Sequence, residues 1–337
     1  MRPHLLFAAV LSCSFSTSLA HALSVDLSQY QRIARYALPE PTTTAAPSGS
    51  LLAQEVSSVT YDRDTDSLFV VGDGGTSIVQ VTKTGQLIDS MTLAAGSSPQ
   101  GTYFYDPESL TYVGAGRFVM TEERYRQANL FTYAPGTTLD GSGVQVVKLG
   151  TTVGNIGIEG MSYDPLTNGF IAVKEKTPQG IFQTTIDFAA GTASNGSPTT
   201  VNSIDLFNPA LLGLVDFADV FALSNLTSLS GDPDFGNILV LSQESGKIVE
   251  TDRNGNVLST LTITNDLGDI AVVDQQHEGL TMDENGFLYV VNENGGGDIN
   301  HPQLWVYAPV PEPGTATLLF LGLAGLSTAS RRRPPVA

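Results

Sequence analysis

The sequence contains one cysteine, and its position indicates that the mature protein has none. Cys13 ends an apolar stretch over residues 5–13, which follows a basic start at Met1–Arg2 and precedes a small-x-small site at residues 20–22. This order is typical of a secretory signal peptide over residues 1–22, cleaved after Ala22. We therefore expect no disulfide, thiol catalysis or cysteine-based zinc site in the folded chain, which its core alone must stabilise.

Basic residues are also scarce. Lysine and arginine together number 16, against 34 aspartates and glutamates, which gives a net charge of −18. Four of the basic residues lie in the terminal segments: Arg2, Arg331, Arg332 and Arg333. A chain this acidic repels nucleic acid and anionic lipid, so we expect no nucleic-acid partner. Its carboxylates are compatible with cation binding or simply with solubility.

The sequence lacks the common catalytic motifs. It has no GxSxG elbow, no HExxH pair and no Walker A loop. The expected mature chain retains two histidines, His277 and His301. An acid–base pair of His277 with Glu278 and a hydrolase built on paired glutamates both stay open, because neither needs a further motif. Nothing in the sequence specifically supports a reaction.

Helical patterns are nearly absent, and one short phrase recurs five times. Successive phrases are separated by 51, 51, 68 and 51 residues, and they begin at Ser57 (SSVTYD), Glu108 (ESLTY), Glu159 (EGMSYD), Thr227 (TSLS) and Glu278 (EGLTMD). Each is followed by a β-type apolar run that closes on an acidic residue: Asp73, Glu123, Glu175, Glu244 or Glu293. Repeats of this length indicate stacked or radially arranged units.

The repeats predict an all-β fold, a five-bladed β-propeller. The first repeat contains the strands of a four-stranded blade, expected over residues 56–62, 68–73, 77–82 and 87–93. The last repeat lacks a fourth strand, and residues 30–38 supply a candidate that completes the last blade, closes the ring and removes exposed sheet edges. The 68-residue interval leaves a six-bladed ring as the alternative. Its extra length is polar, over residues 189–200, and we interpret it as a loop insertion.

Residues 309–337 have the character of a sorting segment. Pro311-Glu312-Pro313 precedes an apolar stretch over residues 316–328 and the basic cluster 331–333, an order typical of a stop-transfer transmembrane segment with its basic end inside. This order resembles the PEP-CTERM sorting signal. The resemblance implies an exosortase-type processing enzyme, transient anchoring in the inner membrane, and delivery to the cell envelope or to an extracellular exopolysaccharide matrix.

The repeat-specific words resemble those of a known family. Over about residues 27–308, the succession of repeats is similar to the SdiA-regulated (YjiK-like) β-propeller family, through ESLTY at Glu108, EGMSYD at Glu159, TSLS at Thr227 and HEGLTMD at His277. The resemblance implies a periplasmic or envelope protein, with some members linked to calcium responses, and attaches no firm reaction. Ser57 and Thr227 depart from the acidic position in the first and fourth repeats.

The repeat also places one set of side chains near the propeller axis. The first strand of each blade lines the channel, so Glu108, Glu159 and Glu278 would converge as metal ligands, with Ser57 and Thr227 as further oxygen donors. Converging carboxylates repel one another unless a cation or raised pKa values relieve them. All-oxygen ligation suits Ca²⁺ or Mg²⁺ rather than zinc. The acids that close the second strands form a second candidate ligand-binding set: Asp73, Glu123, Glu175, Glu244 and Glu293.

Two interpretations of these acids stay open. The glutamates either bind a cation or ligand, or accept backbone N–H bonds that hold neighbouring blades together. We expect residues 23–308 to form one exported propeller domain that binds a cation, with Ca²⁺ the expected ion, or a small ligand in its channel. A metal-dependent hydrolase of phosphoesters, lactones or glycans in the same channel, and a purely structural matrix component, are the alternatives.

Overall fold

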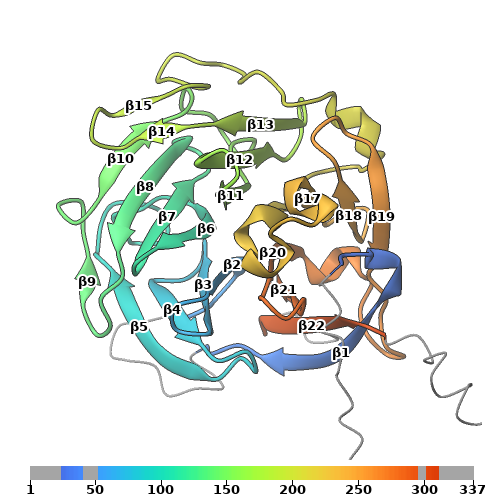
Figure 1. The fold of residues 1–337 in the computed structure, drawn as a ribbon. Helices are drawn as coiled ribbons and strands as arrows, with labels where there is room; N and C mark the ends of the chain where they lie inside the picture. The colour runs from blue at the N-terminus through green and yellow to red at the C-terminus, as the bar shows by residue number, and fades with distance from the viewer. Residues whose placement is uncertain (1–23, 41–51, 295–300, 311–337) are drawn as a thin grey trace, which may run out of the picture.

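The computed structural model describes residues 24–40, 52–294 and 301–310. The expected signal peptide and the segment from residue 311 onward lie outside these ranges. Within them, five small sheets stand around a central axis, and a two-stranded hairpin accompanies one of them (Figure 1). The predicted all-β, five-bladed propeller is confirmed, and the six-bladed alternative is wrong.

The first two blades follow the predicted strand order from the axis outward. The first blade contains β2 (Val56–Asp62), β3 (Ser67–Gly72), β4 (Ser77–Val81) and β5 (Leu87–Leu93), with the short β9 (Thr138–Leu139) added in parallel at its outer edge. The second contains β6 (Pro107–Gly114), β7 (Arg117–Glu122), β8 (Gln127–Thr132) and β10 (Gln145–Lys148).

The 68-residue interval between the third and fourth phrases contains parts of the third and fourth blades. The third contains β11 (Gly160–Asp164), β12 (Gly169–Lys174) and β13 (Gly180–Thr184), followed by the hairpin of β14 (Ile186–Asp187) and β15 (Thr192–Ala193). The fourth contains β16 (Asp219–Ala222), β17 (Ile238–Ser242), β18 (Lys247–Thr251) and β19 (Val257–Thr262). The polar segment 189–200 therefore lies in the hairpin and the loop after it, as an insertion within the third blade.

The fifth blade is closed by the N-terminal strand. Its chain supplies β20 (His277–Met282), β21 (Leu288–Asn292) and β22 (Gln303–Pro309), and β1 (Tyr30–Ala37) pairs antiparallel with β22 as the fourth strand. Figure 1 shows the blue β1 lying beside the red β22, so the two ends of the fold meet in one sheet. The closure predicted from residues 30–38 is confirmed.

Apolar side chains fill each of the five seams between neighbouring blades. Five separate buried clusters occur, and each joins residues of two adjacent blades. Both faces of the middle strands are therefore buried, which explains why runs such as Leu68–Val71 are apolar at every position rather than alternating. No helix in the described ranges is long and apolar enough to cross a membrane.

Short 3₁₀ helices connect the strands. They are η1 (Leu27–Gln29), η2 (Pro209–Leu212), η3 (Leu223–Asn225), η4 (Thr227–Leu229), η5 (Pro233–Gly236) and η6 (Val273–Gln275). The segment from η3 to η5 lies between the first and second strands of the fourth blade, where the other blades have a short connection.

Candidate functional site

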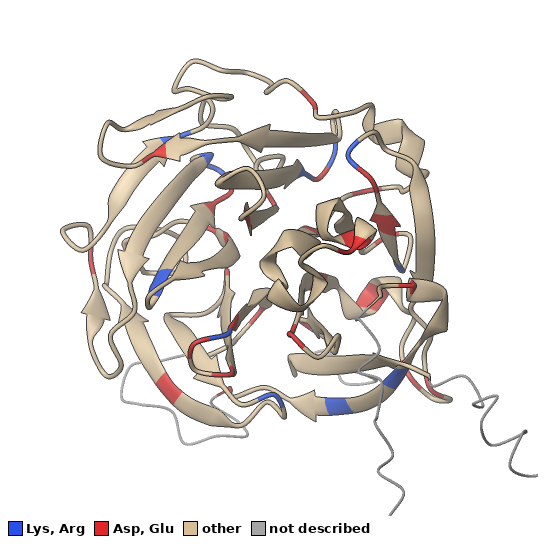
Figure 2. Ribbon diagram, in the orientation of Figure 1, with Lys and Arg blue, Asp and Glu red and all other residues tan. Residues whose placement is uncertain are grey.

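A polar cavity of about 310 Å³ lies at one end of the inner strands. Eight of its lining residues are acidic: Glu55, Asp73, Glu108, Glu159, Glu175, Asp216, Glu278 and Glu293. The others are Asn155, Gln243, Gln276 and Ala218, so none is basic. Figure 2 shows acidic segments at the inner ends of the blades, around the centre of the ring. The predicted glutamates 108, 159 and 278 do line this cavity.

Strand pairing assigns the lining residues to three equivalent levels. The reference pairs of first and second strands are Ser58–Val71, Ser109–Thr121, Gly160–Val173, Asp219–Leu241 and Gly279–Val291. The first level contains the residue one position before the first-strand member of each pair: Ser57, Glu108, Glu159, Ala218 and Glu278. The second level contains the residue two positions after the second-strand member: Asp73, Glu123, Glu175, Gln243 and Glu293. The third level contains the residue three positions before the first-strand member: Glu55, Asp106, Gly157, Asp216 and Gln276.

This register corrects two of the predicted positions in the fourth blade. Thr227 was expected at the start of an inner strand, but it lies in η4, where its backbone N–H and its hydroxyl both contact a Glu284 carboxylate oxygen at 3.1 Å. The inner strand is β16 instead, and Ala218 occupies the equivalent position. The prediction failed because TSLS matches the phrase in letters only. A proline-containing 3₁₀ helix, η5, also separates it from the next strand.

The second correction concerns Glu244, which is displaced by one residue. Gln243 holds the position equivalent to Asp73 and lines the cavity. Glu244 is 38 % exposed and pairs with Lys176 at 2.7 Å. Ser57 occupies the predicted position, but its side chain is buried. Its hydroxyl accepts a hydrogen bond from the Asp73 amide at 3.3 Å, so it contacts the backbone of Asp73.

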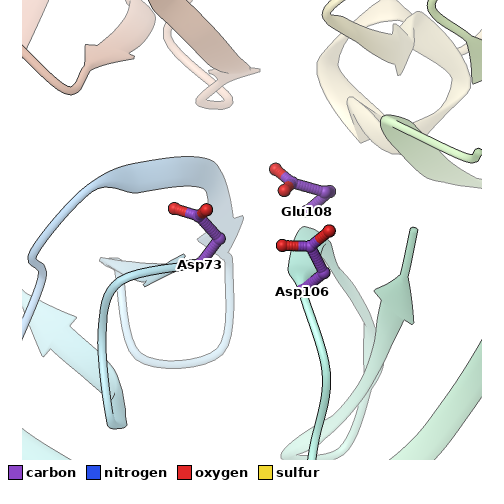
Figure 3. Close-up of side chains that lie close together, drawn as sticks. All are labelled: Asp73, Asp106 and Glu108. Atoms are coloured by element: carbon purple, nitrogen blue, oxygen red, sulfur yellow. The ribbon is translucent and has the colours of Figure 1, made fainter. Parts of the chain in front are cut away.

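One cluster of three carboxylates lies on the side of the first and second blades. Asp73 follows β3, Asp106 precedes β6 and Glu108 lies in β6; one oxygen from each falls within 4.8 Å of the others. Figure 3 shows the three carboxyl groups gathered around a common space. The Oδ1 atom of Asp73 is buried and has no hydrogen-bond partner. Arg124 is the basic neighbour, through its bond to Asp106 Oδ2.

A second cluster lies on the side of the third and fourth blades and is bridged by a lysine. It contains Glu175, Asp216 and Glu244 within the same 4.8 Å limit. The Lys176 ammonium bridges Glu175 at 2.6 Å and Glu244 at 2.7 Å. Asp216 accepts a hydrogen bond from the Ser242 hydroxyl and from the Glu244 amide at 3.1 Å. Each cluster therefore has three carboxylates and one basic partner, but Asp216 has hydrogen-bond donors whereas Asp73 Oδ1 has none.

Burial and mutual repulsion raise the pKa of the lining carboxyls. Burial, followed by the charges of Glu55 and Asp106, raises the pKa of Asp73 to about 6. Burial, followed by the charges of Asp73 and Glu55, raises the pKa of Glu293 to about 8. The pKa values of Glu108, Glu159 and Glu278 are raised well above the usual range, first by burial and then by neighbouring carboxylates. Burial and repulsion therefore favour the protonated form of these carboxyls in the ion-free protein.

The blades are held together by other residues of the repeated phrase. At each seam a backbone N–H donates to a side-chain oxygen on the preceding inner strand, over 2.8–3.2 Å. The pairs are Leu110 to Ser58, Met161 to Ser109, Ala222 to Ser162, Leu280 to Asp219, and Tyr61 to Thr281. No backbone N–H of the described chain donates to Glu108, Glu159 or Glu278, so these seam contacts use the serine, threonine and aspartate side chains of the inner strands instead.

A separate and much smaller space, of about 20 Å³, lies at the opposite end of the inner strands. Its lining is Thr60, Tyr61, Arg63, Thr111, Tyr112, Phe221, Asn225, Leu226 and Met282, with no acidic residue. We call the larger, acidic cavity the axial cup. His277 lies outside its lining: the imidazole is buried with its centroid 4.7 Å from the Trp305 ring. Nothing in this geometry supports an acid–base pair of His277 with Glu278.

Three acidic residues of the site were not predicted: Glu55, Asp106 and Asp216. Each lies two residues before the observed first-strand position, at Ser57, Glu108 and Ala218. Residues two apart on an extended strand share a face, so the spacing of Asp106 and Glu108 offered a signal. The fourth blade hid this signal, because its strand start was assigned to Thr227 rather than to Ala218.

Solved structures that resemble this chain are themselves distant in sequence. A luciferin-regenerating enzyme shares 12 % identity, with 82 % of this chain and 94 % of that one covered and a TM-score of 0.45. A glutaminyl cyclase from Myxococcus xanthus shares 10 % identity, with coverages of 83 % and 95 % and a TM-score of 0.44. A putative 6-phosphogluconolactonase from Bacteroides uniformis shares 13 %, with coverages of 77 % and 69 % and a TM-score of 0.39.

Two family comparisons match the chain itself. A PEP-CTERM protein-sorting motif matches residues 309–333, which implies export, processing by an exosortase and C-terminal sorting with membrane anchoring. A second match covers residues 44–295, most of the propeller, so the chain belongs to the SdiA-regulated family.

Proposed function

We propose that this exported propeller is a binding protein that holds Ca²⁺ in its axial cup and acts at the cell envelope or in the extracellular matrix. The observation that carries the proposal is the lining of the cup, with eight carboxylates and no basic residue. Such a site is stable as a set of charged carboxylates only with a cation inside. In the cation-free protein, burial and the same repulsion raise the pKa of Asp73 and the pKa of Glu293.

The donor set favours calcium over other metals. Every polar lining group offers an oxygen, whereas zinc prefers the sulfur and nitrogen of cysteine and histidine. Mg²⁺ demands a small octahedral shell and keeps several waters, whereas Ca²⁺ accepts six to eight oxygens in flexible geometry. A cup of about 310 Å³ with many carboxylates suits the larger ion.

Within the cup, the cluster of Asp73, Asp106 and Glu108 is the proposed cation position. Its free oxygen, Asp73 Oδ1, is buried without a partner, so it lacks the interaction that a buried carboxylate needs. The Lys176 ammonium already takes the corresponding place beside Glu175 and Glu244. In the first cluster the basic neighbour, Arg124, bonds Asp106 alone, so within the described ranges Asp73 and Glu108 have no ion-pair partner.

Calorimetric titration of the metal-free protein tests the site. We expect saturable binding of CaCl₂, weaker binding of MgCl₂, and a melting temperature that rises with calcium concentration. Asp73→Asn and Glu108→Gln should lower calcium affinity at least about tenfold, because each removes a ligand charge. Glu175→Gln should have a smaller effect, and Asp187→Asn on the exposed hairpin should have none. Absence of calcium binding, or equal loss in all four variants, would contradict the proposed site.

The same preparations decide whether the cup catalyses a reaction. A screen with phosphoester, lactone and glycoside substrates in calcium tests the hydrolase. Turnover that is lost in Glu108→Gln would make the protein an enzyme. Calcium binding without turnover supports a binding role. A protein that neither binds cations nor turns over substrate would leave the structural role.

A further inference from the structure

A second polar pocket lies at the seam of the second and third blades, away from the axial cup. Its space is about 30 Å³, and its lining includes Arg126, Lys174, Asn202, Ser203 and Asp205. Strand alternation explains its composition: Glu175 lines the cup, whereas the preceding Lys174 faces the seam. The pocket thus gathers two of the few basic side chains of this acidic protein.

Both cations of the pocket are buried without an ion-pair partner. Arg126 is 1 % exposed and Lys174 is 8 % exposed. No carboxylate in the described ranges lies within 4.0 Å of either. Arg126 Nη1 donates to the Val201 carbonyl at 2.6 Å and to the Thr200 carbonyl at 3.3 Å. Lys174 Nζ has only two long contacts, to the Thr177 carbonyl at 3.3 Å and to Asn202 Oδ1 at 3.5 Å.

Donors remain free around this space. Arg126 Nε and Ser203 Oγ are buried and have no hydrogen-bond partner, although a buried donor left unpaired costs about 1–3 kcal/mol. Asp205, the acidic lining residue, accepts from the Ile181 amide at 3.0 Å. Two cations and one carboxylate leave a net positive charge in the pocket, which is unfavourable away from water unless an anion balances it.

The backbone holds the guanidinium in a fixed position. A Cβ on Gly150 would lie 2.3 Å from Arg126 Cζ and 2.4 Å from Nε, so only glycine allows the guanidinium to pack against the chain there. Burial lowers the pKa of Arg126, and burial together with the Arg126 charge lowers the pKa of Lys174. The nearby Asp205 acts in the opposite direction on Lys174 but does not offset these effects.

We propose that this seam pocket binds one small inorganic anion, of the size and charge range from chloride to phosphate, between Lys174 Nζ, Arg126 Nε and the Ser203 hydroxyl. The small space excludes a larger organic ligand. The anion would neutralise the pocket and join the loop around Ser203 to the ends of the second and third blades. This site shares no residue with the axial cup, so it does not depend on calcium binding there.

Titration calorimetry of the calcium-free protein in a gluconate buffer tests the proposal, with sodium phosphate, sodium sulfate and sodium chloride as separate probes. We expect saturable binding of at least one anion at one site per chain. Lys174→Gln should weaken it about tenfold or more, because a charge-assisted contact is lost. Ser203→Ala should weaken it less. Lys148→Gln removes the same charge from β10, the outer strand of the second blade, and should leave the affinity unchanged.

Two results would overturn the proposal. One is the absence of saturable binding with all three anions. The other is an equal response of Lys174→Gln and Lys148→Gln, which would indicate charge screening alone. If Lys174→Gln fails to fold, Ser203→Ala and diffraction from bromide-soaked crystals decide: anomalous density between Lys174 and Arg126 supports the site, and its absence there contradicts it. Calcium titration of the same variants separates this outcome from the behaviour of the axial cup.

Discussion

Glu123 of the second blade accepts a hydrogen bond through Oε1 from the Gly157 amide of the third blade at 2.7 Å. Its other oxygen, Oε2, is buried and has no partner. The residue therefore joins two blades and retains one free oxygen near Asp106 and Glu159. Burial is the main reason that the pKa of Glu123 rises, to about 7. Glu123 thus accepts the kind of backbone N–H bond between blades that one interpretation of the repeated acids expects, and its role as a ligand stays a prediction.

The contact between Glu123 and Gly157 predicts a narrow tolerance for substitution. A Cβ on Gly157 would lie 2.1 Å from the Glu123 carbonyl oxygen, so one of the two blades would have to move. We expect Gly157→Ala to destabilise the protein by about 1–3 kcal/mol, as overpacking does. Gly154→Ala is the matched control, because a Cβ there meets nothing within 4 Å. Urea unfolding measures both, and equal midpoints would contradict the prediction.

The raised carboxyl pKa values predict that the stability of the calcium-free protein falls as the pH rises from the unfolded carboxyl pKa of 4.5 to the folded values of about 7 and about 8. Glu123 and Glu293 have folded-state pKa values of about 7 and about 8, above the ordinary 4.5 of the unfolded chain. Between these limits the folded state binds more protons, so stability is lost as pH rises through the folded pKa. Buried His277, whose pKa burial lowers to about 3, contributes in the opposite direction, but only below about pH 6.5.

Thermal melts at pH 7.5 and 8.5 isolate the carboxyl contribution, because His277 is almost entirely neutral in both the folded and the unfolded state over that range. We expect the calcium-free protein to melt several degrees lower at pH 8.5. Saturating calcium should reduce or reverse the difference, since the cation binds the charged carboxylates. If the melting temperature of the calcium-free protein does not decrease from the lower to the higher pH, ionisation of the lining acids does not destabilise the fold, and the prediction is wrong.

The sequence predicts the ring far better than it predicts the fourth blade. Closure of the fifth blade by residues 30–38 is confirmed. The prediction succeeded because the last repeat lacked a fourth strand and the N-terminal segment had no other strand to pair with. Thr227 was placed wrongly because four letters of the phrase recur in a 3₁₀ helix, whereas the real inner strand, β16, carries Asp219 where the other blades have serine or glycine. A carboxylate replaces the hydroxyl in the same seam contact.

The sequence predicted some residues of the site but not how they group. Spacing along one repeat indicates which residues share a level, so Glu108, Glu159 and Glu278 were placed at the cup. It does not indicate which side chains from different levels meet across a seam. The cluster of Asp73 with Asp106, and the neutralisation of Glu175 by Lys176, depend on neighbouring blades and loops that no single repeat describes.

A buried ion pair between the third and fourth blades predicts an acid-sensitive joint. Arg253 donates from Nη1 and Nη2 to the two oxygens of Asp164, both at 2.9 Å, and Ser224 donates to Oδ1 at 2.6 Å. Burial alone would raise the pKa of Asp164, but the bonds from Arg253 and Ser224 hold it below its usual range. Its contribution is present above the unfolded pKa and is lost as pH falls through the folded value.

Removing one partner of this pair should be costly. We expect Asp164→Asn to lower the free energy of unfolding at pH 7 by about 3–5 kcal/mol, because the Arg253 charge is left uncompensated. The double variant Asp164→Leu with Arg253→Met should recover much of that loss. Guanidinium unfolding at pH 7 and at pH 3.5 measures both effects. A single variant as stable as the unmodified protein would show that the pair contributes nothing at this seam.

The closing strand depends on a stacked arginine as well as on its backbone bonds. The Arg32 guanidinium carbon lies 4.3 Å from the centroid of the fully buried Trp305 ring, and Nη1 donates to the Thr264 carbonyl at 2.9 Å. We expect Arg32→Ala to cost about 1–3 kcal/mol through the lost stacking and hydrogen bonds. It should also promote aggregation, because detachment of β1 exposes the edge of β22. Arg117→Ala, at an exposed position of β7, is the control. Urea unfolding and light scattering test both variants, and matching curves would mean that pairing and core contacts alone close the ring.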